Sequence, residues 1–139
     1  MPKPFHYGSD KLTPAIVIAL AEGTRRGIIP EDSMDRILKS RDNVREIVSS
    51  EKTVYGINTG FGILSNTHIS AEDTQTLQQK ILQSHSVGVG RSIPPFLSKI
   101  MMITKVQSLA QGYSGIQPET LARICWFIDQ DICPVVPEK

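Results

Sequence analysis

Apolar residues recur every three to four positions along most of this chain, which is the spacing that places them on one face of an α-helix. This periodicity predicts five helices, and capping residues, prolines and glycines mark where they begin and end. The predicted helices open at Thr13-Pro14, Pro30-Glu31, Ser70, Pro94-Pro95 and Pro118-Glu119, and four of them end at Gly23, Gly88, Gly112 and Pro134. The expected fold class is therefore mainly α.

The same spacing predicts which side of each helix faces a core. Residues expected on buried faces include Leu20, Ile37, Val48, Leu82, Leu97, Met101, Ile103, Val106, Leu121, Ile128 and Ile132. We therefore expect the helices to pack on one another through these faces.

One glycine-rich stretch interrupts the helical pattern. Residues 53–67 read TVYGINTGFGILSNT, with no helical stripe, so we expect a loop with a short strand at Thr53–Tyr55. The glycine spacing matches neither a dinucleotide fingerprint nor a phosphate-binding P-loop. Two interpretations stay open: a tight loop with Tyr55 and Phe61 as core aromatics, or a loop that holds the Tyr55 hydroxyl over a ligand while backbone N–H groups bind an anion.

Composition and charge narrow the class of protein. Hydrophobic residues make up 40% of the 139 residues, and 15 basic side chains against 14 acidic ones leave a net charge of +1. This balance argues against a protein that coats nucleic acid or an anionic membrane. The apolar runs are too short for a membrane span and the N-terminus has no secretory signal, so we expect a cytoplasmic location.

Histidine is the remaining candidate for chemistry. His6, His68 and His85 are scattered without metal-ligand spacing, so no metal site is expected. Ser84-His85 lies where a predicted helix approaches Gly88, and a histidine there commonly interacts with the last carbonyls of the helix. Its position alone therefore favours a structural role.

Four separated motifs together resemble one family. VYGINTGFG, LQSHSVGVG, SLAQGYSGIQPE and PVVPEK follow one another here as they do in the aromatic amino acid ammonia-lyases, and specifically in those that act on histidine. The resemblance covers residues 12–139 and implies the N-terminal region of the L-aspartase-like ammonia-lyase fold, with helices around the glycine-rich loop and at most short strands. These enzymes are homotetramers whose active sites are completed by several subunits.

The resemblance also implies a cofactor. The electrophile of the family is 4-methylideneimidazole-5-one (MIO), which forms from an Ala-Ser-Gly tripeptide soon after the stretch that matches Pro134 to Lys139. No Ala-Ser-Gly occurs in this sequence. We therefore expect residues 1–139 to be the N-terminal, MIO-domain portion of a longer lyase, inactive when isolated.

Five site residues follow from the resemblance. Tyr55 corresponds to the base that removes a β-proton, and the backbone at Gly60 and Gly62 would approach the amino acid. His85 corresponds to a substrate-contacting histidine, and Ser84-His85 matches the pair found in histidine lyases rather than the His-Leu of tyrosine lyases or the Phe-Leu of phenylalanine lyases. The implied reaction is the deamination of L-histidine to trans-urocanate and ammonia, the first step of histidine degradation.

Two alternatives remain at the level of the sequence. A related MIO enzyme, an aryl ammonia-lyase or an aminomutase, would share the loop and Tyr55. If the gene ends at Lys139 without an Ala-Ser-Gly tripeptide, the chain would instead be a non-catalytic helical interaction module. The encoded sequence after Lys139 separates the enzyme from the interaction module.

Overall fold

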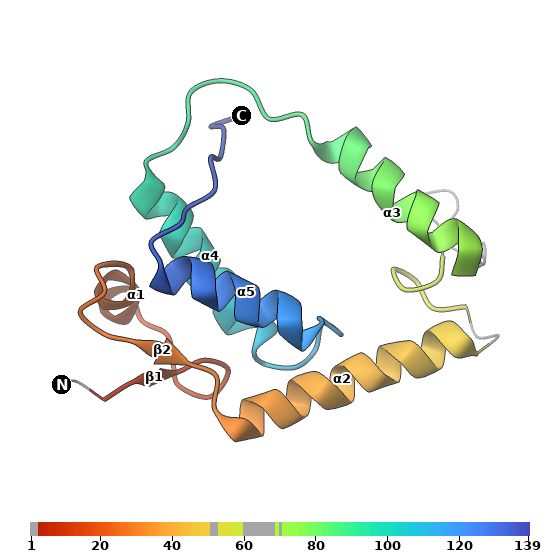
Figure 1. The fold of residues 1–139 in the computed structure, drawn as a ribbon, viewed down its shortest axis with the longest axis horizontal. Coiled ribbons are helices and arrows are strands. Elements are labelled where there is room, and N and C mark those ends of the chain that lie inside the picture. The colour runs from red at the N-terminus through yellow and green to blue at the C-terminus, as the bar shows by residue number, and fades with distance from the viewer. Residues whose placement is uncertain (1–2, 51–52, 60–68, 70) are drawn as a thin grey trace. The chain divides into compact units, whose positions relative to one another are not determined.

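Helices form most of the secondary structure in the computed structural model, which describes residues 3–50, 53–59, 69 and 71–139. Within these ranges the elements are β1 (Phe5–His6), α1 (Pro14–Ala21), β2 (Gly27–Ile28), α2 (Glu31–Ser49), α3 (Ala71–His85), α4 (Pro95–Leu109) and α5 (Pro118–Asp129) (Figure 1). The chain divides into two units, residues 1–41 with 89–139 and residues 42–88, and each is described by itself. The mainly helical fold class is confirmed.

The helix starts follow the local sequence. Thr13 caps α1, with its Oγ1 accepting a hydrogen bond from the Ile16 N–H at 3.4 Å. Prolines begin α1, α4 and α5, where the missing N–H costs no hydrogen bond. The predicted end of α5 at Pro134 is wrong, because the helix stops at Asp129 and Asp131 adopts a left-handed φ of 57°.

The strands differ from the prediction. Thr53–Tyr55 forms no strand, since Val54 begins a hydrogen-bonded turn instead. The strands β1 and β2 pair in parallel, with Phe5 beside Gly27 and His6 beside Ile28. Two-residue strands carry no apolar alternation, so the sequence pattern contains no signal for them.

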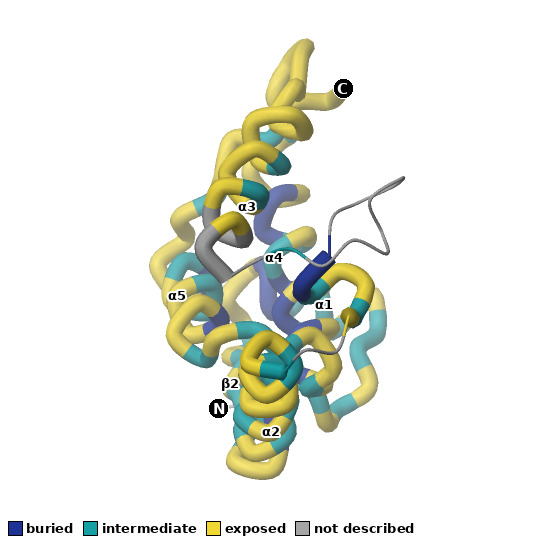
Figure 2. Tube along the Cα trace, turned by 90° about the vertical axis from the view of Figure 1, so that its right-hand side faces the viewer, coloured by how far each residue is buried: buried dark blue, intermediate teal, exposed yellow. Residues whose placement is uncertain are grey.

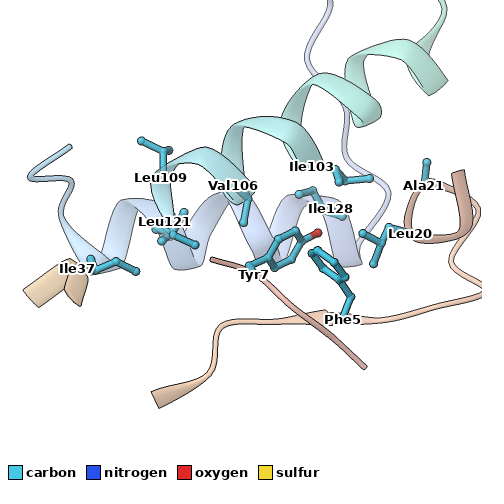
Figure 3. Packing of buried hydrophobic residues seen from close by; sticks show 11 residues of the cluster. Phe5, Tyr7, Leu20, Ala21, Ile37, Ile103, Val106, Leu109, Leu121 and Ile128 are labelled. Carbon is cyan, nitrogen blue, oxygen red and sulfur yellow. The ribbon is translucent and has the colours of Figure 1, made fainter. Parts of the chain in front are cut away.

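The core of the first unit lies between the N-terminal strand, α1, α4 and α5 (Figure 3). Phe5 and Tyr7 pack edge to face with ring centroids 5.3 Å apart. Ile103, Val106 and Leu121 are fully buried against them, as predicted. These aromatic and aliphatic contacts join segments that are about 100 residues apart in the chain.

The first turns of α4 bury other residues than the predicted ones. Leu97 and Met101 are 46% and 50% exposed, whereas Ser98 and Lys99 are buried. Met101 instead lines an apolar groove of about 660 Å³ between α4, α5 and residues 132–136. Ile132, also predicted to be buried, is 45% exposed at this groove.

Polar side chains fix the turn after β1. Gln107 Oε1 accepts a hydrogen bond from the Gly8 N–H, and Gln107 Nε2 donates one to the Asp10 carbonyl, both at 3.0 Å. Ser33 Oγ donates to the Tyr7 carbonyl at 2.9 Å. Gly8 has a φ of 83°, and a Cβ there would overlap the carbonyl oxygen of Ala110. The backbone of this turn therefore touches α4 directly.

The second unit has little buried surface among its described residues, as Figure 2 shows by the exposed colour along much of α3. Val48 and Leu82, predicted to face a core, are 42% and 68% exposed. Periodicity identifies the apolar side of a helix but not what covers it.

In the first unit, residues 136–139 run antiparallel to residues 89–93, with the Ile93 N–H donating to the Val136 carbonyl at 2.9 Å. No described helix is long and apolar enough to cross a membrane.

Candidate functional site

Tyr55 lies on a tight turn in the second unit. The Val54 carbonyl accepts hydrogen bonds from the Ile57 and Asn58 N–H groups at 3.1 and 3.3 Å. Gly56 has a φ of 77°, which a residue with a side chain rarely adopts. The Tyr55 side chain is 65% exposed, so the interpretation of Tyr55 as a core aromatic is wrong and the turn presents the side chain outward.

Two buried polar residues hold this turn, and neither was among the residues predicted for the site. Asn58 and Thr59 are only 4% and 2% exposed. Asn58 Oδ1 accepts a hydrogen bond from the Val54 N–H at 2.8 Å, and Thr59 Oγ1 accepts one from the Gly56 N–H at 3.3 Å. Asparagine and threonine commonly stabilise turns through such local bonds. Their presence beside glycine in the sequence is therefore the signal that predicts this role.

We expect Asn58→Ala to loosen the turn that carries Tyr55. The change removes the acceptor of the Val54 N–H, a hydrogen bond worth about 1 kcal/mol. Amide hydrogen exchange at Val54 should therefore become roughly fivefold faster, as measured by mass spectrometry on the full-length protein. Asn43→Ala, on the exposed surface of α2, is the matched control. Unchanged exchange in Asn58→Ala would contradict the assigned role.

Ser84 and His85 form a joint arrangement in the last turn of α3. His85 Nδ1 lies 2.9 Å from the Ile81 carbonyl and 2.9 Å from Ser84 Oγ, and Ser84 Oγ donates to the same carbonyl at 3.0 Å. A carbonyl only accepts, so this geometry favours the tautomer with the proton on Nδ1. His85 Nε2 then remains an acceptor, and among the described residues nothing hydrogen-bonds to it.

This arrangement combines the structural and functional interpretations of His85. Its Nδ1 interacts with a carbonyl of the last helical turn, as the position in the sequence indicated. Its exposed ring leaves the other nitrogen available to a ligand. Hydrogen bonding at one ring nitrogen fixes what the second nitrogen can do.

The other residues predicted for the site are Gly60, Gly62 and Tyr55. Gly60 and Gly62 lie outside the described residues. Tyr55 belongs to the same unit as Ser84 and His85 but to a separate turn. Among the described residues no group of His, Cys, Asp and Glu side chains is arranged to hold a metal ion. The described residues therefore offer an outward phenol on one turn and an imidazole acceptor on another.

Comparisons with known proteins bear on this site. The family model described as aromatic amino acid lyase matches residues 12–139. A histidine ammonia-lyase from Photobacterium profundum is 40% identical over 111 residues, which cover 80% of this chain and 22% of that protein.

Solved structures are similar over almost the whole chain. Histidine ammonia-lyase from Trypanosoma cruzi has a TM-score of 0.85 and 31% identity, covering 99% of this chain and 27% of its own. A tyrosine aminomutase from Streptomyces globisporus has a TM-score of 0.88 and 26% identity, with 99% and 26% covered. The chain thus spans about a quarter of the length of these relatives.

Proposed function

The chain belongs to the aromatic amino acid lyase family, and we propose that the full-length protein containing it deaminates L-histidine to trans-urocanate and ammonia. The observation that carries this proposal is the Ser84-His85 pair, with its outward imidazole acceptor. Histidine ammonia-lyases among its relatives, such as the one that is 40% identical, support the same substrate.

The His85 ring suits a substrate that carries an imidazole. With its proton on Nδ1, His85 accepts at Nε2 a hydrogen bond from the N–H of the substrate imidazole. The small Ser84 side chain leaves room beside it. The benzene ring of phenylalanine offers no donor, so the acceptor would be left unpaired, and such a loss discriminates strongly between substrates.

Tyr55 supplies the base in this proposal. The turn held by Asn58 and Thr59 presents the Tyr55 side chain to the outside of the described unit. Its side-chain oxygen removes a proton from the β-carbon of histidine, and the electrons of that C–H bond form the double bond as the amine leaves. A fixed turn lowers the entropic cost of aligning this oxygen with the β-carbon.

The electrophile of the family does not fit within these residues. MIO forms from Ala-Ser-Gly, which the 139 residues do not contain, and where present it would supply the activation of the amine as a leaving group. In the proposed enzyme the rest of the polypeptide supplies it, in a homotetramer whose active sites combine several subunits. The residues of this chain would then contribute the base and the contact to the substrate ring.

Activity of the full-length protein tests the proposal. We expect it to convert L-histidine at a kcat/KM about 100-fold or more above those for L-tyrosine and L-phenylalanine, measured by urocanate absorbance and ammonia release. An aminomutase, favoured by the likeness to the tyrosine aminomutase fold, would instead yield a β-amino acid. Preferred turnover of tyrosine would contradict the assignment, and absence of any turnover would favour a non-catalytic interaction module.

A further inference from the structure

A second cavity lies in the first unit and is lined by none of the residues of the proposed reaction. It measures about 400 Å³ and opens between the end of α1, β2, α4 and the end of α5. This volume lies within the range of small-molecule sites. Its lining combines a phenol, a thiol and several charged side chains.

Tyr7 supplies an unused hydrogen-bond donor to this cavity. The residue is 2% exposed, and its hydroxyl makes no hydrogen bond to any residue that the structure describes. Figure 3 shows its ring beside Phe5, with the hydroxyl oxygen in red. Burial raises the pKa of this phenol, and the nearby Cys125 and Asp129 raise it further, so the hydroxyl keeps its proton.

Gly27 makes space for that phenol. A Cβ on Gly27 would lie 2.8 Å from the Tyr7 hydroxyl oxygen and would overlap the ring itself. The absence of a side chain at this position in β2 therefore allows the hydroxyl to reach the cavity.

Positive charge predominates in the lining. Arg25, Arg26 and Lys99 line the cavity together with a single carboxylate, Asp129. Arg26 Nη2 lies 3.7 Å from Asp129 Oδ2, and both side chains are well exposed, so this pair is weak. Arg25 donates through Nε to the Lys3 carbonyl at 2.9 Å, which leaves its terminal nitrogens available.

Lys99 is the buried cation of the group. Its side chain is 10% exposed, and its Nζ donates to Asp131 Oδ1 at 2.9 Å, while the Asp131 side chain is 79% exposed. That bond occupies one of three ammonium donors. Lys99 also lines a second hollow, which contains Asp131, and the cavity itself contains one carboxylate, Asp129.

We propose that this cavity binds a small anion with oxygen acceptors, a carboxylate or a phosphate, through Tyr7, Lys99 and Arg25. The phenol and the ammonium each donate to an oxygen, and the guanidinium adds a charged donor pair. Cys125 forms part of the wall, and burial, reinforced by Asp129, raises the pKa of its thiol to about 11, so it adds no negative charge near neutral pH. The proposal does not depend on the reaction at Tyr55.

Calorimetric titration of the full-length protein with inorganic phosphate, and separately with acetate, tests this site at constant ionic strength. We expect saturable binding of at least one of them, which also identifies the ligand class. Tyr7→Phe should weaken it about tenfold, because a hydrogen bond to a charged group is lost. Lys99→Met should abolish it. Arg123→Ala removes a cation that stacks on Trp126 outside the cavity and should leave binding unchanged.

Thiol labelling provides a second readout that does not depend on heat signals. The bound anion should slow alkylation of Cys125, which lines the cavity, and leave Cys133, which does not, unaffected. Tyr7→Phe keeps the ring and tests the site even if Lys99→Met does not fold. Absence of saturable binding to the wild type, or equal affinity in wild type and Tyr7→Phe, would overturn the proposal.

Discussion

Tyr55→Phe should lower kcat for histidine deamination by about 10²- to 10⁴-fold, the usual contribution of a general base. The phenyl ring keeps the shape of the side chain, and the hydrogen bonds by which Asn58 and Thr59 hold the turn are left in place. KM should change much less, because the proton transfer belongs to the transition state. Steady-state urocanate production by the full-length enzyme measures both constants.

Tyr113→Phe is the matched control for this experiment. Tyr113 is 88% exposed in the first unit, and the same loss of a hydroxyl there should leave kcat unchanged. The ultraviolet absorbance of the electrophile should be the same in both variants and in the wild type. Near-normal turnover by Tyr55→Phe with that absorbance intact would remove Tyr55 from the role of base.

Gly8→Ala should destabilise the first unit by about 4 kcal/mol. Two costs combine: the left-handed backbone at φ 83° disfavours any Cβ, and the added carbon would overlap the Ala110 carbonyl while lying 2.8 Å from Ser33 Oγ. Both neighbours are buried, so neither moves without disturbing the core. The shift in urea midpoint of the full-length protein, followed by circular dichroism, measures the effect.

Gly23→Ala separates the two costs. Gly23 has a similar φ of 73°, but a Cβ there would meet nothing within 4 Å. This variant should lose only about 1 kcal/mol, from backbone strain alone. Equal destabilisation by the two substitutions would show that the contact with Ala110 contributes nothing.

Local signals in the sequence predicted the helix starts well and the packing less well. Thr13, Pro95 and Pro118 act on their own helices, so their meaning needs no knowledge of the rest of the fold. By contrast, Lys99 is buried because Asp131 reaches it from after α5. A lysine in a sequence gives no sign of such a partner, and it is ordinarily expected at the surface.

In the candidate site, too, local features could be predicted from the sequence, whereas contacts between distant residues could not. The motif around Tyr55 indicated a special turn, and the structure adds how Asn58 holds it. Ser84 and His85 are neighbours in the sequence, but which ring nitrogen faces outward depends on the position of the Ile81 carbonyl one helical turn earlier. The unpaired hydroxyl of Tyr7 is a consequence of packing between distant segments, which no local pattern records.

The bond between Gly8 and Gln107 also constrains how the protein is made. The two partners are 99 residues apart, so the N-terminal turn is synthesised long before the side chain that fixes it. At about 5–20 residues per second, that interval lasts about 5–20 s on the ribosome. Phe5 and Tyr7 lack their contacts with Ile103 and Val106 throughout it, because these two residues are synthesised only shortly before Gln107. Docking of the N-terminal strand therefore follows the synthesis of α4, and slower translation of α4 prolongs the exposure of these two aromatic side chains.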